Sequence, residues 1–277
     1  MRKALVISFA LSILVFGCAQ KEFLSKNIYY EAIKAYEQNN LDDAQKLLKK
    51  AIYEAKGMTT EDIMNAKFLL ANVYFKKEMY VDAIVEFEEY ITLYPIAPNI
   101  PEALYKLALS YYKISPDYQR DLTYLKKAEE KALDIIVNYP DSQYAAKSEK
   151  LIEKIKGIYA KHYLEIANLY YNLGKYYSAA FYYDYVLKKY PKYINKKETK
   201  IKLIKSLKNS DKQYKNQIEK YKEQIKDLKD KIKQEKDLEK KNVLLNRKRL
   251  IEDLLFTLES KIKENKLKAE KLSKTLN

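Results

Sequence analysis

The chain has 277 residues, a formal net charge of +15, 28 tyrosines, no tryptophan and one cysteine. Only 4 glycines and 6 prolines interrupt a sequence rich in Lys, Ile, Leu, Glu and Ala, which predicts an all-α protein of one or two domains. A single cysteine excludes an intramolecular disulfide and a cysteine-based zinc or iron–sulfur centre within one chain. The sequence contains no glycine-rich phosphate loop and no catalytic constellation, so we expect no enzyme activity, no cofactor and no metal.

The amino terminus has the pattern of an export signal. Arg2 and Lys3 precede an apolar run from Ala4 to Phe16, which is too short to cross a hydrocarbon core about 30 Å thick. Gly17 then precedes Cys18, and the sequence Val-Phe-Gly-Cys resembles the lipobox of bacterial lipoproteins. We therefore expect a signal peptide over residues 1–17, palmitate-type lipid attachment at Cys18, and a lipidated linker over residues 18–25. An ordinary secretory signal with an incidental cysteine is the alternative.

A repeat is indicated by regularly spaced prolines and alanines. Three helical segments end in Tyr-Pro, at Pro95, Pro140 and Pro191. Twelve residues before these prolines stand Ala83, Ala128 and Ala179, and twelve residues before the first and last of these alanines stand Ala71 and Ala167. Two antiparallel helices approach closely where both carry small side chains, and this spacing is typical of tetratricopeptide repeats.

We therefore predict an all-α tetratricopeptide-repeat superhelix over residues 26–195, with about four repeats. The first repeat contains Ala32 and Ala44 but lacks the closing proline. The third repeat has an insertion around Ser115–Leu122, because Ala108 and Ala128 stand 20 residues apart rather than 12.

The first helix of each tetratricopeptide repeat lines the concave side of a stack. Counting along the repeats places aromatic, amide and lysine side chains in this groove. Asn can hydrogen-bond the backbone of an extended peptide, aromatic rings can hold its side chains, and Lys76 or Lys113 would favour a terminal carboxylate. Packing between repeats is the alternative role of each tyrosine. The predicted groove residues are Tyr29, Tyr36, Phe68, Asn72, Phe75, Lys76, Tyr105, Tyr112, Lys113, Asn168 and Tyr171.

The residues after 195 form a basic tail. They contain 26 Lys and Arg against 14 Asp and Glu, a difference of 12 charges. Residues 196–210 could begin a fifth repeat or serve as a connector, but no partner helix with a matching alanine follows directly. Residues 211–277 carry two heptad seams, from Tyr214 to Ile232 and from Leu244 to Ile262, whose phases do not join.

This basic, coiled-coil-like tail is either one long helical rod whose heptad pattern is interrupted by a skip, or an antiparallel hairpin. Its charge is explained by a solvated helical face, by anionic lipid headgroups or by an acidic partner surface. Because the signal directs the chain out of the cytosol, we expect no nucleic acid partner.

Residues 25–195 resemble the BamD family of outer membrane protein assembly factors. That family shows YP-x-S-x-Y, a long helix ending near a histidine, then A-x-x-Y, G-x-Y-x-A-A and a final YP. A second match is the YP-x-x-PN segment beginning at Tyr94. Two departures are Ala97, where the family often has His, and Tyr182, where many members have a basic residue facing BamA. The matching residues are Tyr139, Pro140, Ser142, Tyr144, His162, Ala167, Tyr170, Gly174, Tyr177, Ala179, Ala180, Tyr190 and Pro191.

The resemblance implies a non-enzymatic lipoprotein scaffold, anchored in the outer membrane through its lipid and facing the periplasm. Its implied partners are BamA, the other subunits of the barrel assembly machinery, and the C-terminal segments of unfolded outer membrane proteins. The alternative is another periplasmic tetratricopeptide lipoprotein, serving cell division, envelope linkage or pilus assembly.

Overall fold

The computed structural model describes residues 26–54, 57–117 and 121–276. Cys18, the signal peptide and the linker lie outside these residues. Within the described ranges the chain is helical and contains no strand, as predicted. A helix over residues 26–37 is followed by α2 (Leu41–Tyr53), α3 (Thr60–Lys76), α4 (Tyr80–Leu93), α5 (Ile100–Ile114), α6 (Thr123–Asn138), α7 (Gln143–Asn172), α8 (Tyr176–Lys189), α9 (Lys196–Gln234) and α10 (Leu238–Ser273).

The chain divides into two compact units, and the division falls inside α7. Unit 1 ends at Ile155 and unit 2 begins at Lys156. The sequence analysis drew its main boundary at residue 195, between repeats and tail. In the structure α8 packs on α9, which is why the fourth repeat and the tail belong to the same unit.

The turns within the repeats share one backbone conformation. Asn39, Glu78 and Gly174 all have positive φ, at 58°, 58° and 71°. Each lies seven residues after the first-helix alanine of its repeat, Ala32, Ala71 or Ala167. In each turn the amide of the following residue donates to a carbonyl five residues back, as from Lys175 to Tyr170 at 2.9 Å. The left-handed residue therefore ends one helix and starts its antiparallel partner.

The Tyr-Pro pairs end the second helices. α4, α6 and α8 stop at the residue before Tyr94, Tyr139 and Tyr190. A proline disfavours helical backbone at the residue that precedes it, so each tyrosine leaves the helix with φ between −129° and −137°. Each tyrosine amide still donates to the carbonyl four residues back.

The alanines predicted from the repeat are fully buried contact points between helices. α3 packs on α4 and α5 packs on α6, and the paired alanines on these helices have no exposed surface. The larger core side chains, such as Phe87, Leu107 and Leu125, fill the space beside them. The alanines with 0% exposure are Ala32, Ala44, Ala71, Ala83, Ala108, Ala128, Ala167 and Ala179.

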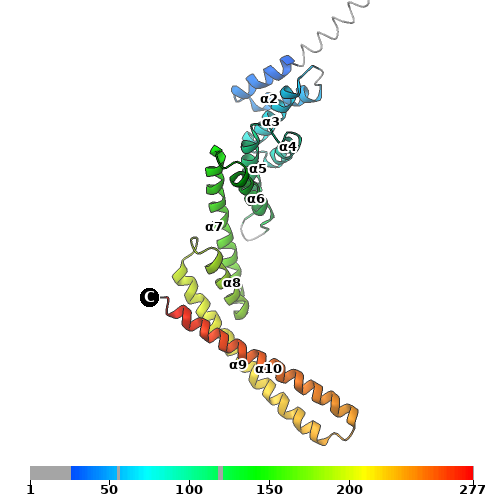
Figure 1. Ribbon diagram of the computed structural model, residues 1–277, viewed down its shortest axis with the longest axis vertical. Helices are drawn as coiled ribbons and strands as arrows, with labels where there is room; N and C mark the ends of the chain where they lie inside the picture. The colour runs from blue at the N-terminus through cyan, green and yellow to red at the C-terminus, as the bar shows by residue number, and fades with distance from the viewer. Residues whose placement is uncertain (1–25, 55–56, 118–120, 277) are drawn as a thin grey trace, which may run out of the picture. The chain divides into compact units, whose positions relative to one another are not determined.

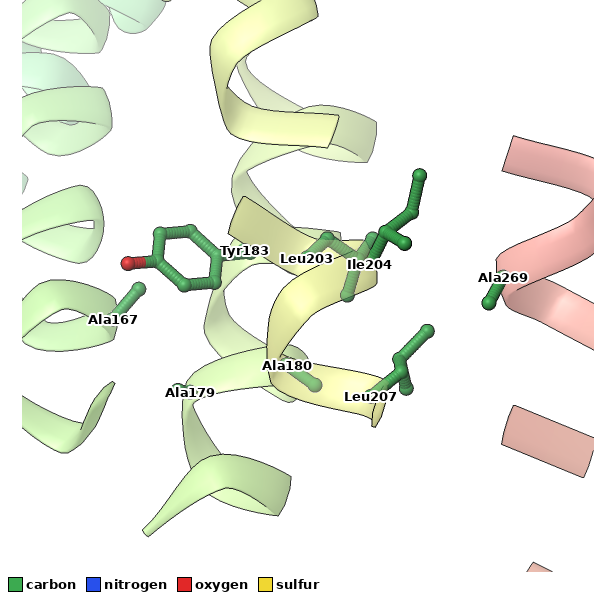
Figure 2. Packing of buried hydrophobic residues seen from close by; sticks show 8 residues of the cluster. All are labelled: Ala167, Ala179, Ala180, Tyr183, Leu203, Ile204, Leu207 and Ala269. Carbon is green, nitrogen blue, oxygen red and sulfur yellow. The ribbon is translucent and has the colours of Figure 1, made fainter. Parts of the chain in front are cut away.

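A fifth helix pair forms in unit 2, and its second helix comes from the end of the chain. Leu203, Ile204 and Leu207 at the start of α9 pack with Ala269 of α10 in one core cluster. Figure 2 shows Ile204 and Leu207 directed from α9 toward Ala269, while Tyr183 points from α8 toward Ala167. Ala269 thus supplies the small residue that the sequence lacks directly after residue 210.

Polar contacts also hold the C-terminal end of α10 against α8 and α9. Lys268 Nζ lies 2.9 Å from Asp184 Oδ2 on α8. Lys200 Nζ, near the start of α9, donates to the Thr275 carbonyl at 3.0 Å and to its hydroxyl at 2.9 Å. The last helix is therefore part of the packed base of unit 2.

Beyond this base, α9 and α10 form an antiparallel hairpin (Figure 1). The loop covers residues 235–237, inside the interval where the two seams lose phase, and Asp237 caps α10 by accepting from the amides of Glu239 and Lys240. Ile218 and Leu228 from the first seam and Ile251 and Ile262 from the second are buried. Of the two arrangements left open by the sequence, the hairpin is therefore the one formed.

One buried polar pair interrupts the hydrophobic seam. Asn265 donates from Nδ2 to Asp211 Oδ1 at 2.8 Å, and both residues are less than a tenth exposed. Burial raises the pKa of the Asp211 carboxyl, although the Asn265 hydrogen bond and the nearby Lys266 and Lys215 oppose that shift. A paired polar group at a seam favours one register of the two helices.

The described residues include no helix that combines the length and the apolar character needed to span a bilayer.

Candidate peptide-binding surface

Lysines on the first helices of the repeats in unit 1 lie close to aromatic rings. Lys76 Nζ of α3 lies 3.9 Å from the ring centre of Tyr36 in the preceding repeat. Lys113 of α5 lies 5.9 Å from the ring centre of Tyr80. Both lysines are exposed, so each ammonium group lies beside an aromatic ring and remains accessible to a bound anion.

Lys106 of α5 is the centre of this arrangement. Its ammonium donates to Asn72 Oδ1 on α3 and, at 2.5 Å, to Glu102 Oε1 one turn earlier on its own helix. It also lies 6.0 Å from the ring centre of Phe68 and 5.9 Å from that of Phe75. One cation therefore joins three of the predicted groove residues to the next repeat.

The side-chain amide of Asn72 makes its hydrogen bonds within the protein. It is 4% exposed, and its Nδ2 donates to the Phe68 carbonyl at 2.9 Å while its Oδ1 accepts from Lys106. A peptide backbone could reach this amide only by replacing those bonds. Asn72 thus orients Lys106 in the structure as it stands.

Several predicted groove aromatics take part in the packing of their own repeat. Phe68 and Phe75 each meet Phe87 of α4 edge-on, with ring centres 6.4 Å apart. Tyr29 is 7% exposed, and burial raises the pKa of its hydroxyl. Phe68 and Phe75 therefore pack within their own repeat, and Tyr29 is buried, although all three were counted into the groove.

The surface continues to the start of α7. Tyr105 and Tyr144 lie with their ring centres 5.6 Å apart, and Lys147 Nζ lies 4.7 Å from the Tyr144 ring. Burial and the hydrogen bond to Glu102 raise the pKa of Tyr144 to about 12. Burial alone would raise the pKa of Glu102, but hydrogen bonds from Lys106 and Tyr144 lower it, so this carboxylate stays charged.

Two predicted groove residues lie in unit 2 and make separate contacts. Asn168 accepts a hydrogen bond from the Tyr183 hydroxyl at 2.7 Å. Tyr171 meets Tyr176 edge-on at 5.3 Å and accepts from Asn209 Nδ2 at 3.4 Å. The predicted set is therefore divided, with nine residues in unit 1 and these two in unit 2.

The sequence analysis missed Lys106, Tyr144 and Lys147. Lys106 directly follows Tyr105, which was counted into the groove, and its side chain reaches Phe68 and Phe75 of the preceding repeat. The spacing of Glu102 and Lys106, four residues apart on a helix, is the signal that could have drawn attention to it. Tyr144 was noted for the family motif alone.

Tyr182, the residue that departs from the family pattern, belongs to a stack of tyrosines in unit 2. Its ring is nearly parallel to those of Tyr170 and Tyr163, at centre distances of 5.5 and 6.4 Å. The side chains that protrude beside it on α8 are Phe181 and Tyr177, which are 60% and 51% exposed. The exposed surface of α8 beside Tyr182 is therefore aromatic.

Comparison with known families identifies the chain's relatives. A family model described as YfiO, outer membrane lipoprotein, matches residues 21–225, which is more than half of the chain. The chain belongs to the YfiO family. This confirms the resemblance found in the sequence.

Individual relatives agree with the family model. A protein of Aquifex aeolicus (strain VF5) named for outer membrane protein assembly factor BamD is 33% identical over 195 residues. That alignment covers 70% of this chain, which spans 64% of the relative's length. BamD of Neisseria meningitidis is 23% identical over 199 residues, covering 64% of this chain and 74% of that protein.

Among solved structures, a tetratricopeptide-repeat protein of Bacteroides fragilis aligns with a TM-score of 0.35 and 12% identity. That alignment covers 91% of this chain and 98% of the other.

Proposed function

We propose that this YfiO-family protein is a non-enzymatic lipoprotein scaffold of the outer membrane barrel assembly machinery. Lipid on Cys18 anchors it in the outer membrane, facing the periplasm. It binds BamA and the other subunits, and it receives the C-terminal segments of unfolded β-barrel precursors.

Family membership is the observation that carries this proposal, because the relatives in Aquifex and Neisseria are named as assembly factors. The surface in unit 1 supports the peptide-binding part. Lys76 and Lys113 present cations beside aromatic rings, and a peptide ending in aromatic residues and a carboxylate has both complementary groups. The exposed Phe181 and Tyr177 in unit 2 offer an apolar surface beside Tyr182, the position at which the resemblance implies a contact with BamA.

Affinity purification from detergent-solubilised membranes tests the scaffold role. Recovery of BamA with the tagged full-length chain is the expected result. Recovery of division or pilus proteins without BamA would instead support the alternative, a tetratricopeptide lipoprotein of another envelope machine.

The peptide-binding part makes a separate prediction for Lys76→Met. A fluorescent peptide of alternating apolar residues that ends in phenylalanine with a free carboxylate should bind about tenfold more weakly to this variant, because a charged hydrogen bond is lost. The same peptide with an amidated end should bind both proteins equally. Fluorescence anisotropy measures the two affinities.

Lys46→Met is the matched control. Lys46 is exposed on α2, so its replacement removes the same charge. It does not belong to the candidate peptide-binding surface. Equal weakening by Lys46→Met, or equal weakening for the amidated peptide, would remove the assignment of Lys76 to the carboxylate.

A further inference from the structure

One face of α10 near the hairpin loop combines exposed apolar and basic side chains. Lys240, Val243, Arg247, Leu250 and Leu254 follow one another at intervals of three and four residues, so they share one side of the helix. We call them the basic–apolar face. All five are exposed, and the three apolar members remain 63%, 61% and 42% accessible. This stripe is distinct from the seam by which α10 packs against α9, which contains the buried Ile251 and Ile262.

Between Lys240 and Leu250 the charge along this face is of one sign, and the acids Glu252 and Asp253 follow before Leu254. From Lys240 to Leu250 the chain carries Lys240, Lys241, Arg247, Lys248 and Arg249 and no acidic residue. Lys248 pairs with Glu252 at 2.8 Å, but no ion pair joins the other four to any described residue. The opposite arm differs, because its lysines are interspersed with acids and make pairs such as Lys231 with Asp227 at 2.7 Å.

The side chains of the basic–apolar face indicate what kind of surface binds to it. A parallel second copy on this face would bring Lys240 and Arg247 near their own equivalents, and an antiparallel copy centred on the face would still bring Arg247 near Arg247. Like charges at such a seam repel. A bilayer surface with anionic headgroups complements the whole face at once. Valine and leucine enter the headgroup boundary, while lysine and arginine extend to the phosphates. The chain belongs to a family of outer membrane lipoproteins, so a membrane is available to it.

We propose that the basic–apolar face of α10 lies on an anionic phospholipid surface. The hairpin thereby makes a second, non-covalent contact with a membrane, independent of the lipid expected on Cys18.

Vesicle binding tests the proposal with a chain that begins at Ala19. This chain keeps all described residues and lacks Cys18, so its result does not depend on lipidation. It should sediment with vesicles of phosphatidylcholine mixed with phosphatidylglycerol and remain free with phosphatidylcholine alone. Lys240→Gln with Arg247→Gln should weaken binding roughly 25-fold, since each basic residue near an anionic surface contributes about fivefold.

The matched control is Lys226→Gln with Lys229→Gln on α9, which removes the same charge from exposed positions on the other arm. These two changes should alter binding far less. No binding to the anionic vesicles, or equal loss from both pairs, would overturn the proposal, and the second result would point to net charge alone. Circular dichroism checks that all variants keep their helices.

A tryptophan reporter tests the apolar part of the contact. The chain has no tryptophan, so Leu250→Trp gives a single signal. Its emission should shift to shorter wavelength when anionic vesicles are added. Leu267→Trp, on the same helix and 54% exposed, stands about 25 Å farther along and should not shift. Equal shifts at both positions, or none at Leu250, would contradict insertion of this face.

Discussion

Replacing Phe87 by alanine should destabilise unit 1 by about 3–5 kcal/mol, the usual cost of removing a buried phenylalanine. Phe87 has no exposed surface, and its ring is the common edge-on neighbour of Phe68 and Phe75. The cavity would also loosen the two rings beside Lys106. Urea unfolding followed by circular dichroism should show an earlier transition for the repeats of unit 1.

Val85→Ala on the same helix is the control. Val85 is 60% exposed, so its truncation should change the free energy of unfolding by no more than about 0.5 kcal/mol. Similar effects of the two changes would show that Phe87 does not occupy the core position that the repeat assigns to it.

Replacing Ala269 by aspartate should destabilise unit 2 by roughly 3 kcal/mol. Ala269 is 7% exposed and packs with the leucines and isoleucine at the start of α9. A carboxylate there would lose hydration against the apolar cluster, and the lysines that line the adjoining pocket, Lys208, Lys266 and Lys274, would offset only part of that cost. Thermal unfolding should show a lower melting temperature for the unit that contains α8, α9 and α10.

Leu267→Asp provides the comparison, because it adds the same charge two residues away. Leu267 is 54% exposed, so we expect this change to lower the free energy of unfolding by less than about 1 kcal/mol, chiefly because aspartate has a lower helix propensity than leucine. If Leu267→Asp were as harmful as Ala269→Asp, the fifth helix pair would not depend on the end of α10.

The repeat architecture could be predicted from the sequence because its signals are local. Alanines twelve residues apart and Tyr-Pro pairs each fix a contact or a helix end within one repeat. Burial of Ala71 with Ala83, and of Ala167 with Ala179, agrees with that prediction. The position of the left-handed turn was not predicted, since only Gly174 of the three residues that adopt it is a glycine.

The return of α10 to the start of α9 could not be predicted, because it joins residues more than sixty positions apart, as between Leu203 and Ala269. The sequence showed a loss of phase between the two seams but no glycine or proline to mark a loop. Asp237 supplies the missing signal as a helix cap, since its side chain accepts from two amides at the start of α10.

The candidate site was predicted as a set of positions, and its role in binding a peptide stays a prediction; the structure bears on the contacts of its individual members. Counting repeat positions finds which helix face a residue occupies. It does not find how far a side chain reaches. Lys106 was passed over for this reason, although its ammonium connects Asn72 with Glu102, and Asn72 was assigned to a ligand although its amide is satisfied internally.

The hydrogen bonds from Lys200 to Thr275 have a consequence for how the length of the α9–α10 hairpin can change in evolution. Because both ends of the hairpin meet in the core of unit 2, residues can be added to or removed from α9 and α10 in equal numbers without altering that core. Each matched pair of heptads would change the arm's reach by about 10 Å. The distance to which the tip extends is thus a property that selection can adjust separately from the repeats.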